Sequence, residues 1–137
     1  MPAGTKIAAR TFQELSTLHY DTTSLTVPYG LPTIVCLCGS TRFAEAYKKA
    51  MIEGTLKGKI VLSIGVDMRT DMEYFNGMED EQLDVIKDNL DMLHLYKIAL
   101  ADEILVLNVN GYIGTSTQRE ISYAKRLGKK IHFLEGI

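Results

Sequence analysis

Residues 33–42 read TIVCLCGSTR, and they carry the clearest indication of the fold. Its first six residues form a short apolar, β-branched run, which is typical of a strand covered on both faces. Residues 39–42 follow as a turn. The following residues predict a helix, because one side of it would carry Phe43, Tyr47, Ala50, Met51 and Gly54. A buried strand, a turn and a helix in this order indicate the first unit of a parallel α/β sheet.

The same alternation continues to the end of the chain. We predict further strands at residues 59–64, 103–109 and 131–134, and a helix at residues 117–127. A long polar loop is expected at residues 65–79, followed by a helix with the inward stripe Leu83, Ile86, Leu90 and Leu93. This order predicts an α/β fold with a flavodoxin-like or Rossmann-like parallel sheet of four to five strands and helices on both faces.

The first 30 residues differ from the rest of the chain. They are rich in Thr and Ser, and they lead into the turn-like sequence PYGLP at residues 28–32. A short helix would fit residues 11–18. We interpret this segment either as a mobile arm or as an oligomer contact. The chain therefore divides into an N-terminal arm, residues 1–30, and one domain of ordinary size, residues 31–137.

The charge and the apolar runs argue against several classes of protein. Lys and Arg number 15 and Asp and Glu 17, for a net charge of -2, so we expect no nucleic-acid polymer as a partner. No apolar run approaches the roughly 20 residues of a membrane span. The first ten residues lack the apolar core of a secretory signal, which favours a cytoplasmic protein.

The two cysteines, Cys36 and Cys38, are predicted to be buried thiols. They would point to the same face of the first strand, and no wider cysteine framework accompanies them. No pair among the histidines, His19, His94 and His132, has the spacing typical of metal ligands. We therefore expect no metal and no other cofactor.

Polar and glycine residues concentrate in three loops that follow predicted strands, at residues 39–42, 65–75 and 108–116. Ligands of open parallel sheets bind beyond the carboxyl ends of the strands. We therefore expect the three loops to form one binding site. The loop at residues 65–75 also carries Met and aromatic residues, so it would serve as a lid or as a subunit contact.

The first loop has the residue types of an anion site. Gly39 would let the backbone approach a ligand closely, Ser40 and Thr41 add hydroxyl groups, and Arg42 adds a planar fork suited to phosphate. The alternative is that Ser40 or Thr41 caps the following helix and that Arg42 is solvated.

The third loop leads into a helix through glycine and hydroxyl residues. Its candidate ligand contacts are Asn108, Asn110, Gly114, Ser116 and Thr117. Thr117 and Glu120 fit a capping box at the start of the helix. A carboxylate in the first helical turn is also favoured in its ionised form by the helix dipole, so Glu120 is at the same time a candidate nucleophile.

Two further ionisable residues are ambiguous. His94 lies near the end of the long helix, one turn after Asp91, which would orient it as a catalytic group. The alternative is a half-buried histidine packed against the sheet. Asp102 precedes the third strand, at the end of the sheet opposite the ligand edge, and we interpret it as a cap or turn residue.

Four ordered segments, within a match that runs from about residue 34 to residue 135, share motifs with a known family. They are residues 38–42 (CGSTR), 101–106 (ADEILV), 111–124 (GYIGTSTQREISYA) and 128–129 (GK). Together they resemble the nucleoside 2-deoxyribosyltransferase superfamily, which includes the deoxynucleoside 5'-monophosphate N-glycosidases. The resemblance implies a flavodoxin-like fold, a nucleoside or nucleotide as small-molecule substrate, and a homo-oligomer.

The resemblance also implies roles for individual residues. Glu120 matches the glutamate that attacks C1' of the deoxyribose. Ser40 and Arg42 match the loop that holds the 5' end of the nucleotide, assisted by Ser116 and Thr117, with Asn108 and Asn110 as candidate sugar or base contacts. His94 stands where the family usually has an aspartate, and Cys36 where it often has a tyrosine that orients the glutamate.

Two other functions remain open on the sequence. One is a non-catalytic module that binds or senses a nucleotide on the same fold. The other is a phosphoribohydrolase of the cytokinin-activating type, which also combines a glycine-rich turn, a threonine and a glutamate. The Pro-Gly-Gly-x-Gly-Thr run that is usual in those enzymes does not occur in this sequence.

Overall fold

The computed structural model describes residues 30–66 and 71–136. The predicted N-terminal arm, with its helix at residues 11–18, lies outside the described residues, apart from Gly30. Within the described part, four parallel strands form one sheet in the order β2-β1-β3-β4. The strands are β1 (Ile34–Cys38), β2 (Ile60–Leu62), β3 (Glu103–Val106) and β4 (Lys130–Phe133).

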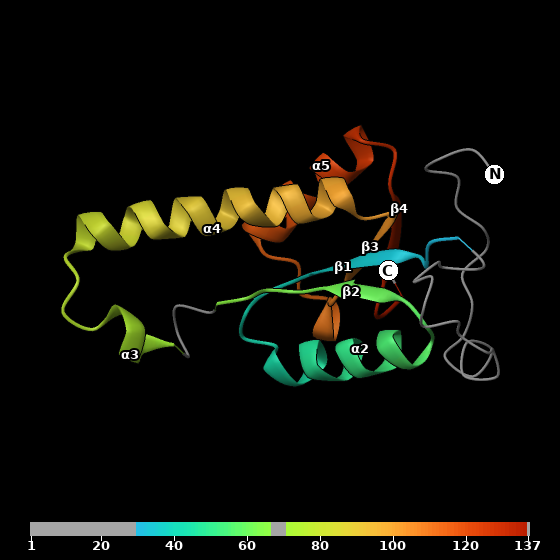
Figure 1. Ribbon diagram of the computed structural model, residues 1–137, viewed down its shortest axis with the longest axis horizontal. Helices are drawn as coiled ribbons and strands as arrows, with labels where there is room; N and C mark the ends of the chain where they lie inside the picture. Colours follow the sequence, from blue (N-terminus) through green and yellow to red (C-terminus); the bar gives the residue numbers. More distant parts are fainter. Residues whose placement is uncertain (1–29, 67–70, 137) are drawn as a thin grey trace, which may run out of the picture.

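Helices cover both faces of this sheet (Figure 1). α2 packs on one face, and α4 and α5 pack on the other. The helices are α2 (Ala44–Leu56), α3 (Met72–Phe75), α4 (Asp80–Leu100) and α5 (Thr115–Arg126), with a 3-10 turn η1 (Val109–Gly111). The predicted α/β parallel sheet with helices on both faces is therefore confirmed.

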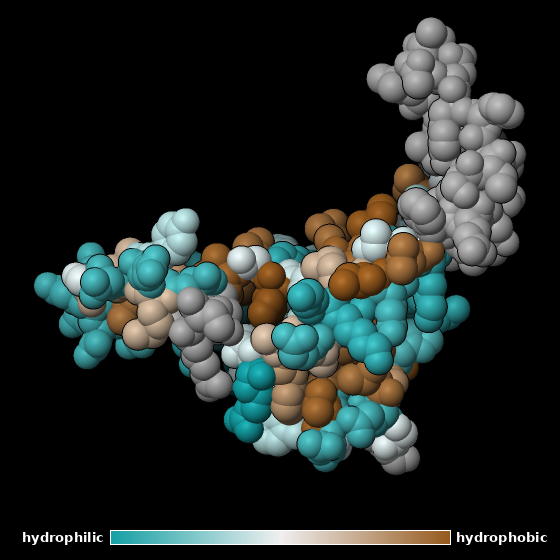
Figure 2. Space-filling view, turned by 90° about the horizontal axis from the view of Figure 1, so that it is seen from below, coloured by the Kyte–Doolittle hydropathy of each residue, from teal (hydrophilic) through white to brown (hydrophobic). Residues whose placement is uncertain are grey.

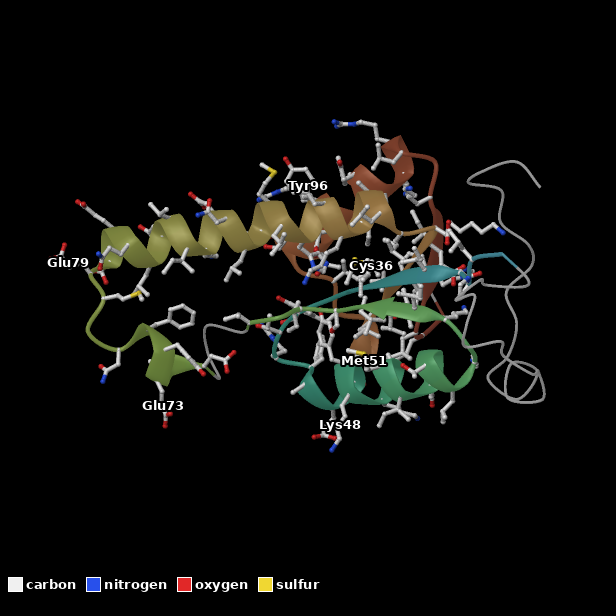
Figure 3. All side chains as sticks on the ribbon, in the orientation of Figure 1. Cys36, Lys48, Met51, Glu73, Glu79 and Tyr96 are labelled. Atoms are coloured by element: carbon white, nitrogen blue, oxygen red, sulfur yellow. The ribbon has the colours of Figure 1, made fainter. Side chains whose placement is uncertain are left out.

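Alternation along β1 divides the core between the two faces. Cys36 and Cys38 face α4 and α5, where they pack with Ile98 and Ile104. Leu37 faces the other way, into the cluster on the α2 side. Figure 3 shows Cys36 between the sheet and α4. Successive side chains of a strand point to opposite faces, so an all-apolar strand is the sequence that a sheet covered on both faces requires.

The longest helix, α4, extends beyond the sheet. Its 21 residues span about 31 Å at about 1.5 Å per residue, and its first turns project from the body above α3 (Figure 1). Figure 2 shows hydrophilic side chains over much of this projecting part. The predicted inward stripe is wrong at Leu93, which is 50% exposed. The inward line instead runs from Leu90 through His94 to the buried Ile98, four residues apart each time.

Several predicted element boundaries also differ from the structure. The second strand covers Ile60–Leu62 rather than residues 59–64, and the last covers Lys130–Phe133 rather than residues 131–134. The third strand ends at Val106 rather than at residue 109, because the chain turns into η1. The last helix begins at Thr115 rather than at residue 117. The predicted loop at residues 65–79 contains α3, while residues 67–70 lie outside the description. Among the helices of the described residues, none combines the length and the apolar character needed to traverse a membrane.

Gly54 in α2 provides a test of how tightly this helix packs on the sheet. A Cβ atom at Gly54 would lie 2.7 Å from Cγ2 of Val61. Replacing glycine by alanine in an open helix stabilises it by about 1 kcal/mol. Here we expect Gly54→Ala to destabilise the protein by about 1–2 kcal/mol, because the clash forces α2 away from β2. Urea denaturation measures the change.

The matched control is the double variant Gly54→Ala with Val61→Ala. It removes the clashing methyl group, so we expect the two effects to be less than additive. Strict additivity, or a stabilised Gly54→Ala variant, would contradict tight packing at this position.

Candidate active site

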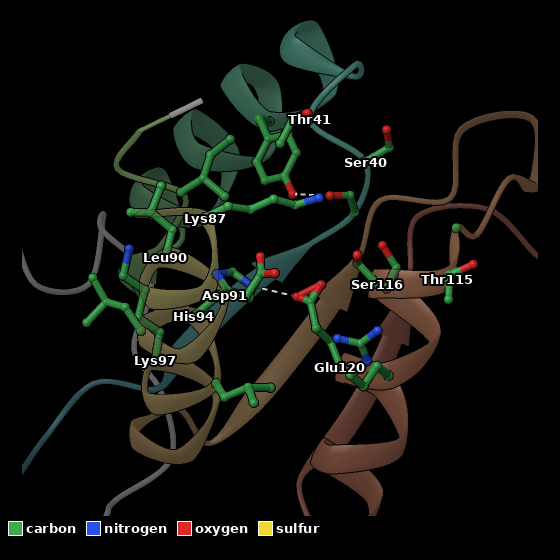
Figure 4. A pocket seen from close by; sticks show the side chains of 18 of the residues that line it. Ser40, Thr41, Lys87, Leu90, Asp91, His94, Lys97, Thr115, Ser116 and Glu120 are labelled. Carbon is green, nitrogen blue, oxygen red and sulfur yellow. Dashed lines mark hydrogen bonds and ion pairs between the residues drawn. The ribbon is translucent and has the colours of Figure 1, made fainter. Parts of the chain in front are cut away.

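A cavity of about 570 Å³ opens at the carboxyl edge of the sheet, between α4 and the starts of α2 and α5 (Figure 4). The loops after β1, β2 and β3 all contribute to its lining. Nine of the predicted site residues line this cavity: Gly39, Ser40, Thr41, Arg42, His94, Gly114, Ser116, Thr117 and Glu120. The fold thus brings these side chains and backbone groups into one site, as the carboxyl-edge rule predicts.

The loop after β1 is held in place through its Gly39 backbone. The carbonyl of Gly39 accepts a hydrogen bond of 2.7 Å from Oη of Tyr47. A Cβ atom at Gly39 would lie 3.1 Å from Cβ of Leu107, so the glycine allows a close approach to the residue that follows β3. Neither Ser40 nor Thr41 caps α2, because the helix begins at Ala44 and its N-cap position is residue 43. The capping alternative is therefore wrong for this loop.

Arg42 is held over an aromatic ring. Its guanidinium carbon lies 4.4 Å from the centroid of the Tyr112 ring, and its Nη2 donates to Oη of Tyr112 over 3.4 Å. Phe43 packs edge-on against the same ring at 5.9 Å. Tyr112 has no predicted role from sequence, although it lies in the motif at residues 111–114. This tyrosine joins the first and third loops and orients the arginine at the mouth of the cavity.

Glu120 and His94 face each other in the inner part of the cavity. His94 Nε2 lies 3.1 Å from Glu120 Oε2, and only 12% and 15% of the two side chains are exposed. Figure 4 draws this contact between α4 and α5. Burial raises the pKa of Glu120 to about 7, although the nearby His94 acts in the opposite direction. Burial would lower the pKa of His94, but Cys36 and Glu120 outweigh it and raise that pKa.

The predicted capping box at Glu120 is wrong. α5 begins at Thr115 with Gly114 as its N-cap, so Glu120 lies in the second turn. The helix dipole acts mainly within the first turn. Burial therefore dominates, and the carboxyl of Glu120 is harder to ionise than expected rather than easier. A capping box does occur at the start of α4, where Gln82 accepts from the Glu79 amide.

Both cysteines lie directly behind His94. The distances from His94 Nε2 to the sulfur atoms are 3.8 Å for Cys36 and 3.6 Å for Cys38. Both thiols are fully buried. A hydrogen bond with Cys38, together with His94, lowers the pKa of Cys36 to about 6 against the opposing effect of burial. The pKa of Cys38 is raised well above its usual range by Cys36 and by burial.

Cations outnumber carboxylates along the cavity. The basic residues of the lining are Arg42, Lys87, Lys97 and Arg119, and the acidic ones are Asp91 and Glu120. Lys97 is tied down, because its Nζ donates to the Ser63 carbonyl over 2.6 Å. Asp91, which was expected to orient His94, also lines the cavity. The polar contacts of His94 Nε2 are made with Glu120 and the two thiols. The balance of charge favours an anionic ligand.

Asn108 and Asn110 are not among the residues that line this cavity. Asn108 is fully buried, and its side chain donates to the Glu135 carbonyl over 3.0 Å and accepts from the Glu135 amide over 2.9 Å. The amide of Asn110, a residue with φ of +54°, donates to the Glu135 carboxylate over 2.7 Å. Both residues hold the third loop against the end of β4, so the structure favours a structural role over the predicted ligand contact.

Asp102 lies at the opposite edge of the sheet, as predicted. Its Oδ2 accepts from the amide of Ile34 over 2.8 Å, at the start of β1. Its own amide donates to the Ile34 carbonyl over 2.8 Å. The prediction of a turn residue away from the cavity is therefore confirmed.

The cavity thus combines an arginine at its mouth, hydroxyl groups along two loops, and a buried carboxyl–imidazole pair with two thiols behind it. Such a site can bind an anion at one end and perform nucleophilic or acid–base chemistry at the other. No protein-family model, no curated protein and no solved structure matches this chain.

Proposed function

We propose that this chain is an enzyme of the nucleoside 2-deoxyribosyltransferase type. It cleaves or transfers at the N-glycosidic bond of a deoxynucleoside or its 5'-monophosphate, with Glu120 as nucleophile. The observation that carries the proposal is the buried Glu120–His94 contact of 3.1 Å within the cavity at the carboxyl edge of the sheet. The resemblance of residues 111–124 to the motif of that superfamily supports the role of Glu120.

The reaction would proceed in two displacements. A carboxylate oxygen of Glu120 bonds to C1' as the bond between C1' and the base breaks, and protonated His94 gives its proton to the departing base. Water, or a second base, then attacks C1' from the other side, gives up its proton to the now neutral His94 and releases Glu120 as a carboxylate. Water makes the protein a hydrolase, and a second base makes it a transferase.

The other end of the cavity fits a 5'-phosphate. Arg42 presents a planar pair of donors, and its stacking on Tyr112 limits the conformations that binding must freeze out. The hydroxyl group of Ser40 lies in the same loop. Charge-assisted hydrogen bonds of this kind contribute about 1.5–3 kcal/mol each.

The test is a panel of nucleosides and nucleotides, deoxy and ribo, with and without a 5'-phosphate, in which free base is measured by chromatography. We expect release from deoxynucleoside monophosphates, and exchange when a second base is added if the protein is a transferase. Preference for ribonucleotides would identify a phosphoribohydrolase instead. If no substrate releases its base, the proposal is wrong.

Arg42 should determine the preference for phosphorylated substrates. We expect Arg42→Ala to raise KM for a deoxynucleoside monophosphate by about 10–100-fold, because one or two charge-assisted hydrogen bonds are lost. KM for the unphosphorylated nucleoside should change little. Steady-state kinetics with both substrates measures the split, and Arg126→Ala, an exposed arginine at the end of α5, is the control. An equal effect on both substrates would contradict the assignment.

The pH profile should be bell-shaped. Glu120 must be ionised to attack, and since its pKa lies at about 7, kcat/KM should rise with pH through that value. His94 must be protonated to donate, and since its pKa is raised, activity should fall again at higher pH. The profile is measured without added metal ions. An acid limb near pH 4.5, the usual value for a glutamate, would show that burial does not raise the pKa of the ionising carboxyl group.

A non-catalytic nucleotide-binding module is the second candidate. It is favoured by the pKa of Glu120, because a carboxyl with a pKa of about 7 is largely protonated below neutral pH and is then a poor nucleophile. A nucleotide that raises the melting temperature without losing its base would support this alternative.

The proposal includes a cytoplasmic homo-oligomer. On the outer face of α4, four large apolar side chains recur at helical spacing: Val85 (59% exposed), Met92 (53%), Tyr96 (62%) and Leu100 (70%). Figure 3 shows Tyr96 on the side of α4 away from the sheet. A stripe of this kind is unusual on a monomer surface and is suited to packing against another helix.

A further inference from the structure

We propose that Cys36, Cys38 and His94 form a binding site for a soft divalent cation such as Zn²⁺, that Glu120 supplies its fourth ligand, and that the bound ion switches the active site off. Binding of the ion can be tested whether or not the chain catalyses the proposed reaction. Its inhibitory effect rests on the proposed function.

The distances fit a tetrahedral centre. Zinc bonds of about 2.3 Å to sulfur and about 2.0–2.1 Å to nitrogen place tetrahedral sulfur and nitrogen ligands about 3.6 Å apart. The sulfur atoms of Cys36 and Cys38 lie 3.8 Å and 3.6 Å from Nε2 of His94. All three ligand atoms lie within 4.8 Å of one another. One ion can therefore bond to all three with small side-chain movements.

Glu120 lies outside the group of three donor atoms, and its carboxylate supplies the fourth ligand by moving from His94 toward the sulfur atoms. Its Oε2 lies 3.1 Å from His94 Nε2, and tetrahedral nitrogen and oxygen ligands of zinc lie about 3.3 Å apart. The donors come from three elements: the thiols from β1, the imidazole from α4 and the carboxylate from α5. Two thiolates, an imidazole and a carboxylate form a donor set that favours Zn²⁺ over Mg²⁺ or Ca²⁺.

The surroundings also suit a held ion. Both cysteines are fully buried in the core cluster that contains Ile98 and Ile104, so the sulfur side of the site is apolar. His94 and Glu120 line the cavity and form the open side through which an ion can enter. On binding, any proton still held by the two cysteines passes to solvent, and both sulfur atoms bond to the metal as thiolates.

Metal binding and catalysis would compete for the same atoms. In the proposed reaction, Nε2 of His94 carries the proton for the leaving base, and a carboxylate oxygen of Glu120 attacks C1'. A metal ion bonded to Nε2 prevents its protonation, and the same ion holds the Glu120 oxygen. One binding event therefore removes both the acid and the nucleophile.

Cobalt spectroscopy tests the metal site without any reference to activity. The metal-free full chain is refolded with Co²⁺, and near-ultraviolet absorption from thiolate–cobalt charge transfer is recorded. The chain has only two cysteines, so such a band must come from Cys36 and Cys38. We expect a band that saturates at one ion per chain and disappears when Zn²⁺ replaces Co²⁺. A folded protein that shows no band would overturn the proposal.

Two histidine variants identify the nitrogen ligand. His94→Gln should weaken Co²⁺ binding by about 100-fold or more, because loss of a ligand exceeds the usual 10–100-fold effect of losing an outer-shell partner. The control is His132→Gln, whose side chain pairs with Glu103 and is 53% exposed. It should bind like the unaltered protein. Equal binding by both folded variants, checked by thermal melting, would exclude His94 as a ligand.

The role of Glu120 has its own readouts. Glu120→Gln should keep the thiolate band, shift the visible d–d bands and weaken binding by about 10-fold or more. Unchanged d–d bands and affinity would exclude the fourth ligand. In the base-release assay, Zn²⁺ should inhibit the unaltered protein and a chelator should restore activity. If the active protein binds Co²⁺ but is not inhibited by Zn²⁺, the proposed switch is wrong. If the protein binds Co²⁺ but releases no base from any substrate, only the proposed function is wrong.

Discussion

Glu120→Gln should lower the rate of base release by about 10³-fold or more, while the protein stays folded. The amide of glutamine has nearly the same shape as the carboxyl group, but it is neutral and cannot form the ester bond to C1' that the two-step reaction requires. The side chain is mostly buried opposite His94, so water has little room to replace it as nucleophile. The effect should fall on kcat, since substrate binding uses the other end of the cavity.

Single-turnover assays with a deoxynucleoside monophosphate measure this loss. The control is Glu53→Gln in α2, an exposed carboxyl that pairs only weakly with Lys49 at 3.8 Å. It should release base at the original rate. If Glu120→Gln also retains its rate, Glu120 is not the nucleophile. If the variant also has a lowered melting temperature, its loss of activity does not distinguish a nucleophile from a structural residue. Glu120→Asp then distinguishes the two roles, because it keeps the charge but withdraws the carboxylate from C1'.

Asn108→Ala should destabilise the protein by about 2–4 kcal/mol, the largest effect on stability that we expect from a single polar side chain here. Asn108 is fully buried and makes two hydrogen bonds to the backbone of Glu135. Alanine leaves the amide and the carbonyl of Glu135 without these partners and opens a cavity under the third loop. Since this loop leads to Tyr112 and α5, its loosening should also weaken substrate binding.

Urea denaturation gives the change in the free energy of unfolding. The neighbouring variant Asn110→Gly is the control, because Asn110 has φ of +54°, a conformation that glycine adopts without strain. Its bond to Glu135 is made by its backbone amide, which glycine retains. We expect this control to change stability by no more than about 0.5 kcal/mol. A loss of similar size in both variants would show that the loop, and not the Asn108 side chain, is what matters.

Local pattern predicted the fold well for a physical reason. A strand that is buried on both faces must be apolar throughout, as residues 34–38 are, and a helix that covers it must repeat its apolar positions at helical spacing. Both requirements act over a few consecutive residues, so the pattern can be recognised in the sequence without knowing which segments pack together in the fold. The carboxyl-edge rule then places the loops at residues 39–42 and 108–116 beside one cavity.

Element ends and ionisation could not be predicted in the same way. Thr117 and Glu120 have the spacing of a capping box, yet the helix begins at Thr115, and the actual cap is set by where the chain leaves η1. The pKa of Glu120 depends on its burial between α4 and α5. Asn108 resembles a ligand residue in a polar loop, but the end of β4 passes beside it and takes up its hydrogen bonds.

The sequence alone predicted the parallel α/β architecture, the loops at its ligand edge and eleven candidate residues, of which nine proved to line the cavity. Each of these depends on short-range periodicity, on one topological rule or on a motif that is continuous along the chain. Only the tertiary structure decided that Glu120, His94, Cys36 and Cys38 meet at one point. These residues come from α5, α4 and β1, and no spacing along the chain relates them. Their meeting follows from how the two helices pack on the sheet, which is a property of the whole core.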